Sequence, residues 1–134
     1  MLDEVATRLT QSGFVPRMLV ESDTETIMLG EGIECFLFPV GDEWDKPDYM
    51  TGLVRYGRTH RFGVLLVIPV EEEADGPELS AIETQADLVT KALAGWQPAS
   101  ASAPVRPLEA GLQAITRGRI WWNMVFETEH ELRI

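Results

Sequence analysis

The stretch LVRYGRTHRFGVLLVIP, residues Leu53–Pro69, decides the fold predicted for this chain. Its second half is an almost unbroken run of bulky and β-branched side chains, which favour a central strand covered on both faces. Pro69 ends the run, because proline has no backbone N–H to donate to a neighbouring strand. The first half carries Arg55, Arg58 and Arg61 and no acidic residue. The sequence therefore predicts one long strand, buried at one end and reaching towards solvent or a partner at its cationic end.

Periodic apolar positions predict the other elements. Apolar residues spaced three and four positions apart predict two helices. The first is short, begins at Leu2 and ends before Gly13, and the second is long and amphipathic. Alternation and turn signals give the strands, the last two forming a hairpin around the Arg117-Gly118 turn. The long helix is predicted over Glu78–Trp96, and the remaining strands over Phe14–Val20 (a short edge strand or an extended segment), Ile33–Val40, Pro107–Thr116 and Arg119–Leu132.

These elements predict an α+β fold in a single domain, residues 1–134. We expect a mostly antiparallel or mixed sheet of about four to five strands, with two main helices packed on it. In the last strand the even-numbered side chains form the core face, whereas Trp121 is expected beside a loop or an interface.

Two long connections have the composition of loops. Residues 41–52, GDEWDKPDYMTG, are rich in Gly, Pro and Asp. This loop carries Trp44 and Tyr49, which are covered either by a neighbouring subunit or by the loop folding back on its own sheet. The proline-rich connector, residues 97–107, is expected to be exposed and mobile.

The bulk composition narrows the classes of protein. The formal net charge of −11 argues against tight binding of nucleic acid, which draws on clustered Lys and Arg. The single cysteine, Cys35, sits in an apolar run and is expected to be a buried, inert thiol in a reducing compartment. No apolar run is long enough to span a bilayer, and the acidic start does not resemble a secretory signal.

No pattern of catalytic, cofactor-binding or metal-ligating residues is found. His60 and His130 stand seventy positions apart; the first is expected to be solvated or interfacial and the second to lie at a surface strand end. The acidic residues between 42 and 48 match no calcium-loop spacing and are expected to be solvated. We expect no enzyme, no cofactor and no metal.

The second half of the chain does carry a recognisable ordered set. THRFGVLLVIPV is followed by a helix ending in ALAGWQP, a proline-rich link, and a hairpin whose second strand reads GRIWWNMVFETEHELR. This set, covering roughly residues 52–133, resembles the tail terminator (tail completion) proteins of long-tailed, siphovirus-like phages and prophages.

The resemblance implies a structural virion protein. Members of that family form a hexameric ring on the last ring of tail-tube subunits, which stops tube polymerisation and provides a surface for head–tail joining. The implied partners are further copies of the chain, the tail-tube protein and a head-completion or connector protein, with DNA passing through unbound and no membrane. The implied location is the head-proximal end of the phage tail, after synthesis in the bacterial cytoplasm. The alternatives are another ring-forming head–tail connector or head-closure protein, or a small non-viral α+β binding domain.

Charge suggests how such subunits would meet. A closed ring uses heterologous contacts, so each subunit needs two different complementary patches. We expect the basic strand end of one subunit to meet the acidic loop of its neighbour. The residues predicted at a subunit or tube interface are Arg55, Arg58, His60, Arg61, Asp42, Glu43, Trp44, Asp45 and Trp121.

Overall fold

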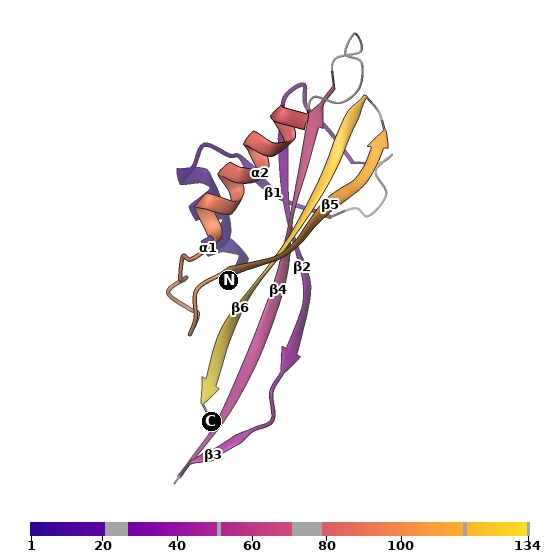
Figure 1. The fold of residues 1–134 in the computed structure, drawn as a ribbon. Helices are drawn as coiled ribbons and strands as arrows, with labels where there is room; N and C mark the ends of the chain where they lie inside the picture. The colour runs from indigo at the N-terminus through magenta and orange to yellow at the C-terminus, as the bar shows by residue number, and fades with distance from the viewer. Residues whose placement is uncertain (21–26, 51, 71–78, 117, 134) are drawn as a thin grey trace.

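The computed structural model describes residues 1–20, 27–50, 52–70, 79–116 and 118–133, and shows two helices packed on one face of a long twisted sheet (Figure 1). The predicted α+β class is confirmed, but the sheet has six strands and not four to five. In chain order the elements are α1 (Leu2–Gln11), β1 (Pro16–Met18), β2 (Glu34–Trp44), β3 (Asp48–Met50), β4 (Leu53–Pro69), α2 (Leu79–Leu93), β5 (Arg106–Thr116) and β6 (Arg119–Arg133).

The strands follow the order β1-β2-β4-β6-β5, with β3 pairing to the free start of β4. The first strand is parallel to β2, and the other pairs are antiparallel. The short edge strand predicted near the N-terminus is therefore confirmed as β1. The hairpin predicted around Gly118 is confirmed as β5 and β6, and Gly118 has the positive φ of 67° that such a turn favours.

Strand β4 is the centre of the sheet, with the bounds predicted from the sequence. Its apolar half, Phe62 to Ile68, is buried throughout because side chains cover both faces. It pairs with β6 along its length, from Arg55 opposite Arg133 to Pro69 opposite Arg119.

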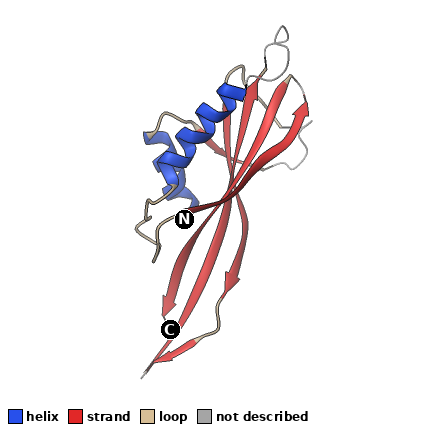
Figure 2. Cartoon of the chain, in the orientation of Figure 1, coloured by secondary structure: helices blue, strands red, loops and turns tan. Residues whose placement is uncertain are grey.

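The larger core lies between the sheet and the two helices, which Figure 2 shows stacked on the same face. The predicted apolar stripe of α2 is confirmed by Ile82, Val89 and Leu93, which are buried in this core. The helix ends before the predicted Trp96, near Gly95 with a φ of 81°. Trp96 still packs against the core, under the guanidinium of Arg8 at 5.4 Å from the ring centre.

A second core lies on the opposite face of the sheet. Phe36, Leu65, Val67 and Trp121 are buried there beneath Ile27, which belongs to the segment between β1 and β2. Trp121 is 0% exposed and donates its indole N–H to the Thr116 carbonyl oxygen at 3.2 Å. Of the two positions predicted for Trp121, beside a loop or at an interface, the structure supports the first: Trp121 is a core residue that packs with Ile27 of the segment between β1 and β2.

The two predicted loops are both more ordered than expected. Residues 41–44 continue β2 after an irregularity between Pro39 and Gly41, and β3 pairs with β4. Within the predicted loop of residues 41–52, the described residues that lie outside strands are therefore 45–47 and 52. The connector is pinned by backbone bonds, including Val105 N–H to the Trp96 carbonyl oxygen at 2.8 Å, and Val105 is buried. The predicted exposure of the connector is confirmed for most of residues 97–107, whereas Pro98, Ala101 and Val105 are buried.

Neither helix in the described part of the chain is long and apolar enough to cross a membrane.

Candidate functional site: a charged arm of the sheet

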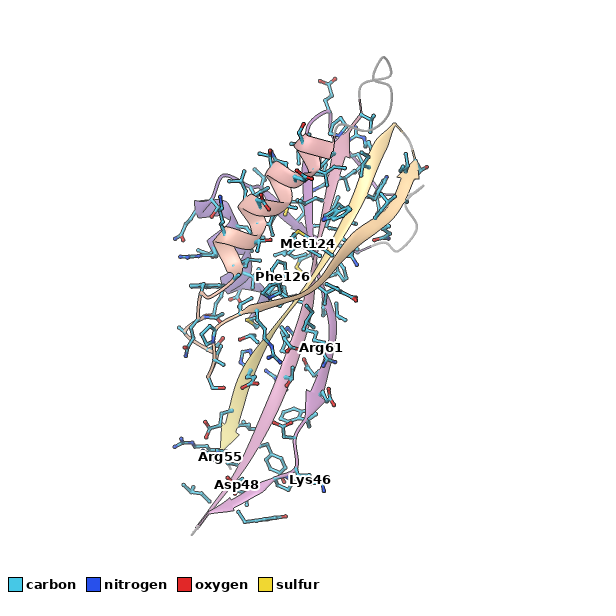
Figure 3. All side chains as sticks on the ribbon, in the orientation of Figure 1. Lys46, Asp48, Arg55, Arg61, Met124 and Phe126 are labelled. Carbon is cyan, nitrogen blue, oxygen red and sulfur yellow. The ribbon has the colours of Figure 1, made fainter. Side chains whose placement is uncertain are left out.

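One end of the sheet extends beyond the helices as a long twisted projection, seen at the bottom of Figure 1. It consists of residues 41–44 of β2, strand β3, residues 53–61 of β4 and residues 127–133 of β6. We call this projection the arm. Figure 3 shows its charged and aromatic side chains standing on both faces, with Arg61 near its root and Arg55 near its tip.

A buried carboxylate fixes the root of the arm on the face opposite the helices. Glu127 is only 2% exposed and accepts hydrogen bonds from Arg61 Nε at 3.2 Å and from Arg106 on β5. Arg61 also reaches Glu43 on β2 at 3.2 Å. Four strands are thus joined by one ion-pair network, which offsets the cost of burying the charge.

An aromatic and charged cluster occupies the helix-side face of the arm. The register places Asp42 opposite His60 and Trp44 opposite Arg58. His60 Nδ1 bonds the Asp42 carboxylate, and Arg58 Nη1 lies 3.8 Å from the same carboxylate. The Arg58 guanidinium lies 5.4 Å from the Trp44 ring centre. Trp44 is therefore partly covered by its own sheet, yet it stays 51% exposed.

His130 lies beneath the connector and not at a surface strand end. It is 8% exposed, and its Nδ1 donates to the Ser100 carbonyl oxygen at 3.0 Å. Burial lowers the pKa of His130 below its usual value, and the positive charge of Arg58 lowers it further. The ring centres of His130 and His60 are 6.0 Å apart. The described residues nevertheless contain no group of three or more His, Cys, Asp or Glu placed to hold a metal ion.

The tip of the arm is tied by ion pairs but keeps exposed apolar side chains. Arg55 binds Asp48 on β3 at 2.9 Å and Glu131 on β6 at 3.4 Å. Tyr49 is 76% exposed and Leu53 47% exposed. The tip thus presents aromatic and aliphatic surface on a backbone held by strand pairing.

The structure brings eight of the nine predicted interface residues together on or beside the arm, and leaves Trp121 in the second core. It also pairs the predicted basic and acidic groups within one chain, since Arg58 and Arg61 meet Asp42 and Glu43 across the β2–β4 ladder. Sequence reasoning missed Glu127 as a charged partner. The sequence does not single it out, because Glu129 and Glu131 lie on the same odd-numbered face of the strand.

Cys35 offers no nucleophile to this site. It is 2% exposed in the larger core, and burial raises the pKa of its thiol to about 12. The predicted burial of the thiol is confirmed.

Comparison with known families matches residues 34–134 to the model of the phage tail terminator protein family. The chain belongs to this family. The resemblance inferred from the sequence is thereby confirmed, and with it a structural role in a phage tail. No curated protein matches the chain. The matched residues of this tail terminator include every strand of the arm, whereas α1 and β1 precede the matched part.

Proposed function

We propose that this tail terminator caps the phage tail tube as a hexameric ring, stops tube polymerisation and presents the surface on which the head is joined. The location that follows is the head-proximal end of the tail. Membership of the terminator family supports the tail role, and the observation that carries the capping role is the arm.

The arm has the properties of a docking element. It reaches beyond the packed helices, yet its strands are held by backbone pairing and by ion pairs at both its root and its tip. A preorganised element loses little conformational entropy on binding, so more of its contact energy appears as affinity.

The arm's charges are largely neutralised within the chain, which shifts binding to its apolar side chains. Arg55, Arg58 and Arg61 each already lie against a carboxylate. Interfaces draw most of their energy from a few anchor residues, among which tryptophan and tyrosine are enriched. We therefore assign contact with the tail-tube or head-completion protein to the exposed side chains Trp44, Tyr49 and Leu53.

The acidic composition fits a ring through which DNA moves. The formal net charge of −11 disfavours adhesion of phosphate backbones to the protein surface. DNA thus passes through the proposed ring without specific binding to the protein.

The proposal is tested by measuring molar mass in solution and imaging any large species by negative stain. A hexameric ring has a mass of about 90 kDa, because one chain has a mass of 15.0 kDa. If the chain alone is monomeric, the same imaging is done after addition of tail tubes from the same phage. Rings at tube ends support the proposal, and a stable dimer that ignores tubes contradicts it.

The assignment of the arm is tested separately with Tyr49→Ser/Leu53→Ser. This double variant is expected to fold normally, because both side chains are exposed, and to bind tubes more weakly than the wild type. Leu88→Ser is the matched control: Leu88 is 42% exposed on α2, away from the arm, and its loss is expected to leave tube binding unchanged.

A further inference from the structure

Exposed apolar side chains gather at the two opposite edges of the sheet as well as on the arm. Among the described residues, fourteen large hydrophobic side chains are exposed, and half of them lie at these edges. On the β5 edge they are Leu108, Leu112 and Ile115, and on the β1 edge they are Val15, Met18, Val20 and Met28. Two separate apolar edges on one chain suit a head-to-tail contact.

Both edges present backbone that the described residues do not pair. Strand β5 pairs with β6 alone, and β1 pairs with β2 alone, within the part of the chain that the structure describes. Natural proteins cover or charge such edges, because unpaired N–H and C=O groups template further strand pairing. From Ala110 to Thr116 strand β5 carries no charged residue.

Strand directions make the two edges compatible. Reading across the sheet, β1 and β2 run one way, β4 the other, β6 the first way and β5 the other. A second copy placed beside the first in the same orientation therefore sets its β1 antiparallel to β5 of the first. The antiparallel ladder then continues across the junction.

The edges also match in level and face. Successive partners across the sheet are Met18, Leu37, Val64, Met124 and Ala110, so Met18 and Ala110 lie at the same height. Directly opposite residues of a ladder share a face, which places both side chains on the helix side. By the same reading Arg17 is level with Gly111, on the other face.

A polar hollow at Gly111 complements Arg17. It is lined by Glu109, Gly111 and Asn123, and a Cβ at Gly111 would meet nothing within 4 Å. The Asn123 Oδ1 atom is buried and lacks a hydrogen-bond donor among the described residues. A buried acceptor without a donor lowers stability, so a hydrogen-bond donor from another chain is favourable at this site.

The opposite edge supplies that donor. Arg17 uses Nη2 to bind the Met28 carbonyl oxygen and Glu34, and its guanidinium lies over the Phe36 ring at 4.8 Å from the ring centre. Its Nε and Nη1 form no hydrogen bond with a described residue. Glu109 forms no ion pair with a described residue, so an incoming guanidinium meets an available carboxylate as well as the Asn123 oxygen.

We propose that neighbouring subunits join by antiparallel pairing of β5 in one chain with β1 in the next, with Arg17 of the second chain set over Gly111 between Glu109 and Asn123 of the first. The partner is a second copy of this chain. The inference rests on the proposed ring and names the surface that closes it. Because the contact is heterologous, it repeats around a closed ring and does not end at a dimer.

Cross-linking between introduced cysteines tests the junction. The double variant Met18→Cys/Ala110→Cys is treated with a bismaleimide whose linker is about 10 Å long, which tolerates a stagger of about three residues at ~3.4 Å each. The native Cys35 stays unmodified, because it is 2% exposed and its thiol has a pKa of about 12. The reaction is run on the protein alone and on tail tubes from the same phage.

The expected result is a ladder of covalent species up to the hexamer in the double variant, with each single variant remaining monomeric. The control Met18→Cys/Leu88→Cys, whose second cysteine lies on α2, is expected to give no ladder. A covalent dimer from Ala110→Cys alone would show a symmetric β5–β5 contact and overturn the inference. Rings seen by imaging without a ladder would also overturn it, while leaving the proposed function intact. Absence of any ring on tubes would instead refute the proposed function, and the inference with it.

Discussion

Gly63 is the position at which a single methyl group tests the packing at the root of the arm. It lies on β4 opposite Phe38 of β2, and a Cβ built there overlaps the Phe38 ring, which rests directly on the glycine backbone. Gly63→Ala must therefore push the Phe38 ring away from the second core, against which it packs. Overpacking of this kind costs about 1–3 kcal/mol, and the displaced ring loses apolar burial as well.

We expect Gly63→Ala to lower the free energy of unfolding by about 2–3 kcal/mol, which corresponds to a fall in Tm of roughly 6–12 °C for a chain of this size. The measurement is urea unfolding followed by tryptophan fluorescence, with a thermal scan beside it. Gly41→Ala is the matched control: a Cβ there meets nothing within 4 Å and φ is not positive, so a change within about 0.5 kcal/mol is expected.

A double-mutant cycle identifies the cause of the loss. In a Phe38→Ala background the obstructing ring is gone, so Gly63→Ala should cost less than about 0.5 kcal/mol there. An equal cost of Gly63→Ala with and without the Phe38 ring would refute this packing argument and point to the backbone.

Three further predictions concern the ion pairs, the thiol and the buried histidine. Glu127→Gln should cost about 2 kcal/mol in urea unfolding, because a buried carboxylate loses two charge-assisted bonds, whereas the exposed Glu129→Gln should cost little. Cys35 should react with a thiol reagent at pH 8 only after unfolding, since burial raises its pKa to about 12; rapid reaction of the native protein would contradict its placement. The pKa of His130 lies below its usual value because of burial and the Arg58 charge, so the unfolded chain binds the proton first as pH falls below about 6.5. Wild type should therefore lose stability from that pH down to the lower folded pKa, and His130→Gln should lose less over pH 7.5 to 5.5 as measured by unfolding free energies; equal losses would contradict the assigned burial.

The parts of the fold that the sequence predicted are those with a buried face. The long strand ending at Pro69, the apolar stripe through Val89 and Leu93, and the even-numbered core face of β6 each follow from side chains that avoid water. In these elements hydrophobic periodicity and structure have the same cause.

The β4 and β6 parts of the arm were predicted, but its β2 and β3 parts could not be, because residues 41–44, 48 and 49 are exposed and have no buried face. Residues 41–44 and Asp48–Met50 are polar and rich in turn formers, and only pairing with β4 makes them strands. The same pairing joins Arg58 to Asp42 and Arg61 to Glu43, groups that lie more than ten positions apart in the chain. From the sequence, we expected the basic patch of one subunit to meet the acidic patch of its neighbour, whereas the pairing of β2 with β4 joins the two patches within one chain.

The burial of Trp121 could not be predicted for a different reason. Its strand face looked like a mixture of apolar and polar residues, and the cover for it comes from Ile27, which the chain brings from the other edge of the sheet. Such a long-range contact leaves no local pattern in the sequence.

The most direct test of the account is tube growth. Tail-tube protein from the same phage is polymerised with and without this terminator, and tube lengths and ends are imaged by electron microscopy. If the terminator caps tubes, elongation stops once it is added and one end of each tube carries a ring. Tubes that keep growing at the uncapped rate, with the terminator absent from their ends, would contradict it.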